Sequence, residues 1–257
     1  MLKMSSRKLG LIKVGRCIYP EKTITEIDGF VTINVLCGKY KYSPLSPYSL
    51  TDDNGSIIEN VWQFSKVYMR VPEVDITLNK WSKLKWKWPS ETHVDSQYNV
   101  TPKYRAWRSA GMKFKSAIRY PVGFDYRHKC VASWWCPECT SHEVCNHEGE
   151  YMDYIQARKN IYMPLYCNSV IKHDLFRDLL GLLLNGVNLL IIDVDGPHQE
   201  LLSYYQEKYG VGSDFINDNA VDVTNDNMQI LLSDSKKPFG HGYCLAIALY
   251  KVALLEM

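Results

Sequence analysis

One short stretch of the sequence carries polar side chains at a spacing that suits acid–base chemistry. Glu59, Gln63, Lys66 and Arg70 are four, three and four positions apart, which places them on one face of a helix. A carboxylate on such a face is able to act as a general base or to stabilise an oxocarbenium-like centre. Trp62 lies beside this face and offers a ring for stacking. The same spacing also describes an ordinary solvated face of a helix.

Cysteine and histidine gather in a second stretch, in the order Cys130-x5-Cys136-x2-Cys139-x5-Cys145-x-His147. Zinc takes four sulfur or nitrogen ligands in a tetrahedron, and a C-x2-C pair brings two thiolates onto one ion. We therefore predict a structural zinc site whose remaining ligands come from Cys130, Cys145 and His147. Free thiols in a loop are the alternative.

Basic and aromatic residues alternate between positions 80 and 108. Basic residues follow a phosphate backbone while rings stack on unpaired bases, so this stretch is the best candidate for binding single-stranded nucleic acid. The alternation also fits an amphipathic strand whose lysines face outward. The residues are Lys80, Lys83, Lys85, Lys87, Lys103, Arg105 and Arg108 with Trp81, Trp86, Trp88, Tyr104 and Trp107.

The elements that position these residues follow from hydrophobic periodicity and turn signals. We predict a hairpin within residues 10–45, with its turn at Asp28-Gly29, and a helix from residue 58 to 69. Residues 117–122 suit a short strand. Residues 175–184 form a strongly apolar pattern that predicts a helix, ended by Gly186.

The last third of the chain alternates between buried-strand and core-helix patterns. Residues 187–194 predict a buried strand that ends at Asp193 and Asp195, and residues 242–255 predict a core helix. Together the elements favour an α+β, helix-rich single domain over residues 1–257. The Cys/His loop at 126–150 is expected to be an inserted zinc-binding module.

Composition places the chain among ordinary globular proteins. It has 257 residues, 46% hydrophobic and 23% charged, and its net charge of +2 gives no field that steers nucleic acid. The apolar run at 179–194 is interrupted too often to span a membrane. No signal-peptide pattern is recognised at the start, so we expect a cytoplasmic protein whose 8 cysteines are thiols or metal ligands. With 18 Tyr and 7 Trp, either ring-binding pockets or a bulky core is expected.

Three segments resemble the NADAR family, also called YbiA-like, in matching order. Leu45-Ser46-Pro47-Tyr48 and a turn at Gly55 precede Glu59-x3-Gln63-x2-Lys66, which is similar to the family's first helix. A helix at 176–184 and then Asp193-Val194-Asp195-Gly196 stand where the family has a helix and an acidic loop. Phe239-Gly240-His241-Gly242 before an apolar helix resembles the start of the family's last helix.

The resemblance implies a YbiA-like fold and hydrolysis of an N-glycosidic bond between a ribosyl group and a base, such as removal of ADP-ribose from a nucleobase. It implies that Glu59 activates water or stabilises the ribosyl cation, and that Asp193 or Asp195 holds ribose hydroxyls or assists proton transfer. The substrate-binding residues that it implies are Ser46, Tyr48, Trp62, Gln63, Lys66, Arg70, Gly240 and Gly242.

Two further hypotheses remain open from the sequence. One is a non-enzymatic, zinc-containing protein that binds nucleic acid through residues 80–108. The other is a transferase that acts on the same nucleotide chemistry, in which a base and not water attacks the sugar.

Overall fold

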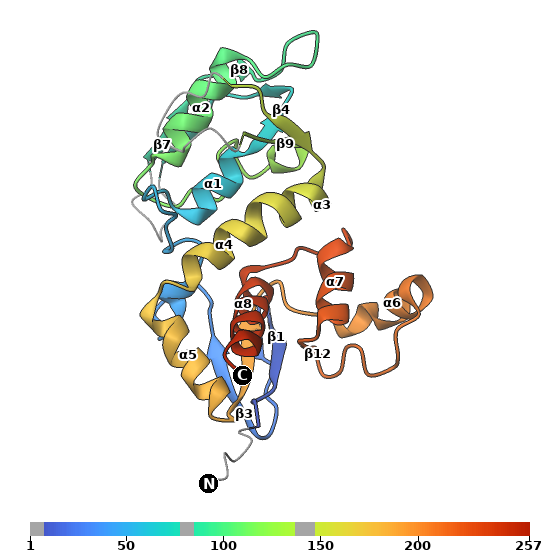
Figure 1. The fold of residues 1–257 in the computed structure, drawn as a ribbon. Helices are drawn as coiled ribbons and strands as arrows, with labels where there is room; N and C mark the ends of the chain where they lie inside the picture. The colour runs from blue at the N-terminus through green and yellow to red at the C-terminus, as the bar shows by residue number, and fades with distance from the viewer. Residues whose placement is uncertain (1–7, 78–84, 137–146) are drawn as a thin grey trace. The chain divides into compact units, whose positions relative to one another are not determined.

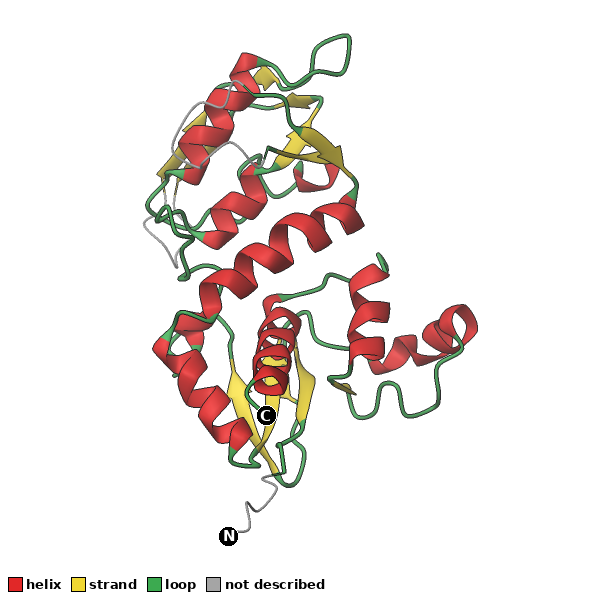
Figure 2. Ribbon diagram, in the orientation of Figure 1, coloured by secondary structure: helices red, strands yellow, loops and turns green. Residues whose placement is uncertain are grey.

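The computed structural model describes residues 8–77, 85–136 and 147–257, and it combines helices with strands (Figures 1 and 2). The mixed α+β class predicted from the sequence is confirmed. The chain divides into two compact units, which we call unit 1 (residues 1–46 and 166–257) and unit 2 (residues 47–165). The sequence predicted one domain with a short insertion at 126–150. The structure instead gives a longer segment, 47–165, that is a compact unit by itself.

Unit 1 is built on a sheet in which β11 (Asn188–Asp193) lies between β1 (Ile12–Ile18) and β3 (Phe30–Asn34), parallel to both. Leu189 to Ile192 are all 0% exposed, as expected of a strand buried on both faces of a parallel sheet. β12 (Ala220–Asp222) pairs antiparallel with β1. The predicted strand at 187–194 is confirmed.

Two helices of unit 1, α5 (Asp174–Leu184) and α8 (His241–Leu255), lie side by side and pack on this sheet (Figure 1). Both were predicted, and Gly186, at a φ of 84°, follows α5 as expected of a C-terminal glycine. The remaining helices of the unit are η4 (Gln199–Leu201), α6 (Leu202–Tyr209) and α7 (Asn225–Ser233), and the division between the units falls within α4 (Met163–Val170).

The predicted hairpin at 10–45 is wrong in its pairing. Gly29 does form a turn, at a φ of 79°, but β3 after it pairs with the distant β11. β1 makes its hairpin with β2 (Thr23–Ile24) instead. β11 is a fully apolar central strand and needs a neighbouring strand on each side. β1 and β3 fill these two places, so they do not pair with each other.

Unit 2 holds short antiparallel strands around two helices, α1 (Ile58–Phe64) and α2 (Pro102–Met112). The strands, in pairs, are β4 (Lys66–Tyr68) with β9 (Cys130–Trp135), β9 with β10 (Glu150–Met152), β5 (Arg70–Val71) with β8 (Glu91–Thr92), and β6 (Val74–Thr77) with β7 (Lys85–Trp88). α3 (Tyr154–Ala157) continues into the π-helical turn η3 (Arg158–Tyr162). Residues 117–122, predicted as a strand, form bends and turns.

Aromatic side chains fill the core of unit 2. The Phe64 ring lies 4.5 Å from that of Trp107 and 5.1 Å from that of Trp86, centroid to centroid. α2 approaches α1 closely at Gly111, where an added Cβ would lie only 1.9 Å from the Phe64 ring. A substitution at Gly111 would therefore force the two helices apart.

The first helix of unit 2 is shorter than predicted. α1 ends at Phe64, so Lys66 lies on β4 and Arg70 on β5 and not on a helix face. The Ser65 carbonyl accepts a hydrogen bond from the Trp134 amide on β9, 2.8 Å away. Val67 and Tyr68, which favour strands, then continue the pairing with β9.

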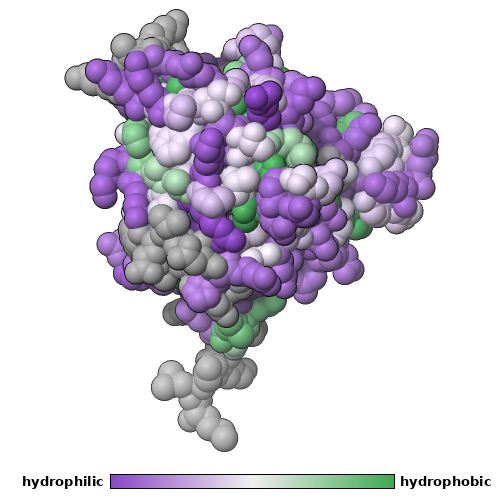
Figure 3. Space-filling view, turned by 90° about the horizontal axis from the view of Figure 1, so that it is seen from above, coloured by the Kyte–Doolittle hydropathy of each residue, from purple (hydrophilic) through white to green (hydrophobic). Residues whose placement is uncertain are grey.

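No helix within the described ranges is long and apolar enough to cross a membrane. On the face shown in Figure 3, hydrophilic residues predominate and hydrophobic residues appear in small groups.

Candidate functional site

A turn in the chain fixes the start of α1 and with it Glu59. The Asp52 carboxylate accepts hydrogen bonds from the amides of Asn54 and Ser56, and Gly55 between them has a φ of 76°. The amide of Glu59 then donates to the carbonyl of Pro47, 2.9 Å away. The predicted Gly55 turn is thus confirmed as the structure that leads into the helix.

Glu59, Gln63 and Lys66 form a continuous chain of hydrogen bonds. Gln63 Nε2 donates to Glu59 Oε1 at 2.9 Å, and Lys66 Nζ donates to Gln63 Oε1 at 2.8 Å. Glu59 is only 5% exposed and Gln63 8%, so the polar groups compensate one another in a buried place. The three residues, predicted to share one face of a helix, are thus joined by hydrogen bonds, but Lys66 reaches the chain of bonds from a strand.

Trp62 lies next to this chain and is half-buried. Lys66 Nζ lies 5.3 Å from the centre of its ring, within the range of a cation–π contact. The ring of Tyr162 is 5.2 Å away and that of Tyr154 6.4 Å, centroid to centroid. These two tyrosines were missed in the sequence, because nothing in their spacing connects them with a residue so far upstream.

Burial lowers the pKa of Lys66 below that of an ordinary lysine, and the carboxylate of Glu59 partly opposes this effect. The Arg119 guanidinium adds a further lowering of the Lys66 pKa. Cys130 is also close to Lys66, and burial raises the pKa of its thiol. The thiol donates to the carbonyl of Ala132 at 3.1 Å, as a neutral donor.

The structure places three other residues of the predicted substrate site on other segments of the chain. Arg70 is exposed on β5, outside the hydrogen-bonded chain that begins at Glu59. Ser46, 1% exposed, belongs to unit 1, where its Oγ lies 3.1 Å from Cys37 Sγ. Tyr48 is half-buried in unit 2.

Asp193 and Asp195 belong to unit 1, whereas Glu59 belongs to unit 2. Asp193 ends β11, is 2% exposed, and its Oδ2 accepts a hydrogen bond from the amide of Gly242 at 2.7 Å. His241 Nδ1 lies 3.4 Å from the same oxygen, while its Nε2 donates to the carbonyl of Val35. Asp193 therefore caps the start of α8, a structural role that the sequence did not reveal.

The glycines before and inside α8 allow this cap to form. A Cβ on Gly240 would lie 2.4 Å from Asp193 Oδ2, and one on Gly242 would lie 2.7 Å from Asp193 Cβ. Their presence is thus explained by the close approach of the carboxylate. The amide of Gly242, expected to face a phosphate, is hydrogen-bonded to Asp193 instead.

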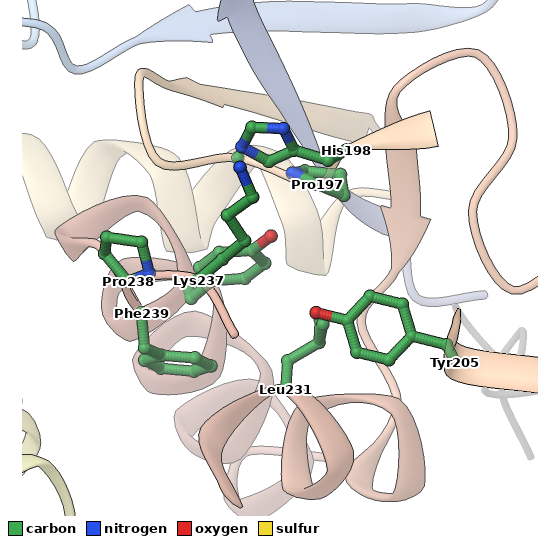
Figure 4. Close-up of a pocket in the computed structure, with 9 residues that line it drawn as sticks. Pro197, His198, Tyr205, Leu231, Lys237, Pro238 and Phe239 are labelled. Carbon is green, nitrogen blue, oxygen red and sulfur yellow. The ribbon is translucent and has the colours of Figure 1, made fainter. Parts of the chain in front are cut away.

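A small hollow lies near the same end of β11 in unit 1 (Figure 4). Tyr205, Leu231 and Phe239 contribute an apolar lining, and Lys237 points toward His198 (Figure 4). His198 Nδ1 lies 2.6 Å from Glu200 Oε1, and Arg16 lies 3.4 Å from the same oxygen. The imidazole of His198, which lines the hollow, is therefore held by a carboxylate that also pairs with Arg16.

Two of the predicted zinc ligands, Cys139 and Cys145, lie outside the described residues. The other three are Cys130, Cys136 and His147. Cys130 begins β9 and Cys136 follows its end, so about 20 Å of extended chain separates their Cα atoms. Thiolates on one zinc ion lie within about 4 Å of each other, so Cys130 and Cys136 cannot share an ion. His147 is exposed, and within the described ranges no group of three or more suitable side chains could hold a metal.

The rings of the basic and aromatic stretch lie mostly in the core. Trp86 is 4% exposed, Tyr104 0% and Trp107 1%, and Trp86 Nε1 donates to the carbonyl of Pro121. The lysines beside them, Lys85 and Lys87, face solvent. For β7, the structure therefore agrees with an amphipathic strand whose lysines face outward. Trp81 lies outside the described residues.

Comparison with known proteins found no match to a family model, to a curated protein or to a solved structure.

Proposed function

We propose that the chain is an N-glycoside hydrolase that cleaves a ribosyl–base bond and removes ADP-ribose from a nucleobase, with a YbiA-like fold. The observation that carries the proposal is the buried carboxylate of Glu59 in a hydrogen-bonded chain that ends at Lys66, beside the half-buried Trp62. This set supplies a base, a cation and a ring from α1 and the start of β4.

The proposed reaction breaks the bond between C1 of the ribose and a nitrogen of the base. The bonding electrons leave with the base, which takes a proton from the solvent, while the ribose develops oxocarbenium character. Glu59 takes a proton from the water that attacks C1, and Gln63 holds the carboxylate in place through its 2.9 Å hydrogen bond. Trp62 stacks on the base, and Lys66 binds a phosphate of the substrate.

Unit 1 has a smaller part in this proposal than the resemblance implies. Asp193 is already engaged in capping α8, so we do not assign it proton transfer. We likewise do not propose that residues 80–108 bind single-stranded nucleic acid, because the rings that would stack are buried in the part of this stretch that the structure describes.

The test is product analysis with an ADP-ribosylated nucleoside as substrate. We expect free ADP-ribose and unmodified nucleoside in equal amounts. ADP-ribose that appears only on an added acceptor base would indicate a transferase, and no cleavage at all would contradict the proposal.

A further inference from the structure

The segment between α2 and β9 is anchored at several points to the core of unit 2. Ile118 is 0% exposed, and its amide donates to Asn60 Oδ1 at 2.8 Å. Trp86 Nε1 donates to the carbonyl of Pro121 at 3.0 Å, and Val122 is 1% exposed. The residues between and after these anchors are therefore presented to solvent on an anchored backbone.

A turn in this segment brings two aromatic rings together. The amide of Gly123 donates to the carbonyl of Tyr120 at 3.0 Å, and Gly123 has a φ of 83°. The rings of Tyr120 and Phe124 lie 5.1 Å apart, centroid to centroid, and meet edge to face. Phe124 is 56% exposed, so a large apolar ring faces solvent here.

Arginine side chains lie against both rings. Arg127 Cζ is 3.5 Å from the centre of the Phe124 ring and 5.7 Å from that of Tyr120. Arg119 Cζ is 5.2 Å from the centre of the Tyr120 ring. A planar guanidinium stacks on a ring and keeps its N–H donors at its edge. A nucleobase is able to extend such a stack, while the donors at the edge reach phosphate oxygens.

Positive charge is concentrated in the same segment. Residues 113–129 contain five lysines and arginines, all exposed, and a single acidic residue, Asp125. The net charge of the whole chain is only +2, so the excess of cations in this segment is larger than that of the whole chain. The five are Lys113, Lys115, Arg119, Arg127 and Lys129.

We propose that Tyr120, Phe124, Arg127 and Lys129 form a surface that binds single-stranded nucleic acid. The rings and the guanidinium stack on unpaired bases, and the basic side chains contact the phosphates between them. The inference does not depend on the proposed function, because none of these four residues belongs to the hydrogen-bonded chain of Glu59, Gln63 and Lys66. It also concerns a different segment from residues 80–108, whose described rings are mostly buried.

Other anionic partners fit this surface less well. The Phe124 ring cannot enter the hydrocarbon of a membrane without taking the Arg127 guanidinium with it, since the two are in contact. An acidic peptide would pair with the cations but would leave the rings without a planar partner. A single strand offers both regularly spaced phosphates and unpaired planar bases.

The test is fluorescence anisotropy with labelled oligodeoxythymidylate and oligouridylate of about 15 nucleotides, over a range of salt concentrations. We expect both to bind, with the logarithm of the association constant falling linearly as the logarithm of the salt concentration rises. Phe124→Ala should weaken binding about tenfold at an unchanged salt slope, because it removes stacking and no charge. Tyr98→Ala removes another exposed ring of the same unit and should keep the wild-type affinity.

Lys129→Gln tests the contribution of charge. It should reduce the steepness of the salt dependence by about 0.7, as expected for the loss of one phosphate contact to a single strand. Its matched control is Lys103→Gln, at an exposed lysine on α2 of the same unit, which should keep the wild-type slope. The four substituted side chains are all exposed, so the variants should fold, and circular dichroism checks this.

Absence of oligonucleotide binding at low salt would overturn the proposal. A folded Phe124 variant with wild-type affinity, or equally tight binding of polyglutamate, would also overturn it, since either result indicates a surface that responds to charge alone. Binding to anionic phospholipid vesicles that depends on Phe124, without oligonucleotide binding, would indicate a membrane surface and would overturn it as well.

Discussion

Burial and hydrogen bonding give Lys66 properties that an ordinary surface lysine lacks. Its ammonium group donates to Gln63 and lies over Trp62, and the carboxylate of Glu59 raises its pKa in partial opposition to burial. Such a group loses its proton more readily than a solvated lysine, because burial penalises the charged form. If Lys66 binds a phosphate of the substrate, as the proposed function has it, this binding should therefore depend on pH.

The lowered pKa of Lys66 predicts the direction of that dependence. As pH rises, the ammonium is lost at a lower pH than for an ordinary lysine, so KM for the substrate should increase on the alkaline side. Arginine keeps its charge throughout this pH range, so in Lys66→Arg the rise of KM should begin at a higher pH. The measurement is KM against pH for both proteins. Identical profiles would show that Lys66 does not bind the phosphate.

The residues of the candidate site were predictable to different degrees. The spacing of Glu59, Gln63 and Lys66 in the sequence identified a set that does form a chain of hydrogen bonds. Arg70 continued the same spacing but lies on β5, since periodicity cannot show where a short helix ends. Tyr162 reaches the site through tertiary structure alone.

At the scale of elements, Asn60 joins α1 to the segment that follows α2. Replacing it with Ala removes three buried hydrogen bonds and leaves backbone groups without partners. We expect the free energy of unfolding of unit 2 to fall by about 3 kcal/mol. Denaturant unfolding measures this, with the exposed Asn99→Ala as the control. A change below about 1 kcal/mol would mean that the segment is held by other contacts.

A second prediction concerns α6, which is fastened to the chain before α8 by Asp234. The carboxylate, 1% exposed, accepts hydrogen bonds from Tyr204 and Tyr209 at 2.7 Å and from Lys208 at 3.0 Å. Burial by itself raises the pKa of Asp234, but hydrogen bonds, those from the two tyrosines foremost, outweigh it and lower the pKa to about 2.

Because the folded pKa is below the ordinary value, the stabilisation is complete above about pH 4 and is lost as pH falls toward the lowered pKa. Asp234→Asn should therefore lower the stability of unit 1 at neutral pH by about 2 kcal/mol and flatten its acid dependence. Thermal unfolding of both proteins at neutral and acid pH checks this. An equal acid dependence in the variant would exclude Asp234 as its source.

Elements with strong local patterns were the predictable ones. α5, β11 and α8 each combine a continuous apolar pattern with a clear end, and each lies where the sequence places it. The predicted hairpin at 10–45 is wrong because β3 pairs with a strand more than 150 residues away, and no local pattern reveals such a partner. The predicted strand at 117–122 is wrong because the amide of Ile118 donates to Asn60 Oδ1 and not to a neighbouring strand, and the segment forms bends and turns.

At the scale of the whole molecule, the aromatic excess has a structural explanation. Most of the Trp and Tyr residues in the positions 86–134 of unit 2 pack into its core, among them Trp86, Trp107 and Trp134. Trp62 differs because it is half-buried beside polar groups. Composition alone could not separate rings packed in a core from a ring half-buried beside polar groups. It also could not show that residues 47–165 form a unit of their own.

The zinc module remains a prediction, and β9 makes it more specific. Because the strand separates Cys130 from Cys136, Cys130→Ala should keep any bound zinc while Cys136→Ala should lose it. Metal analysis of the purified proteins gives the answer directly. Loss of zinc in the Cys130 variant, with the fold retained, would contradict this assignment, and a wild-type chain with no zinc would remove the module.

The measurement that tests the central claim most directly is the single-turnover rate of ADP-ribose release by Glu59→Gln. The control is Glu91→Gln, which makes the same change at a carboxylate of the same unit that is also buried, 9% exposed, and pairs with His93. Loss of a general base typically costs about a hundredfold or more in rate. We expect that loss for E59Q at unchanged substrate affinity, and a near wild-type rate for E91Q. A folded E59Q protein that releases ADP-ribose at the wild-type rate would contradict the account.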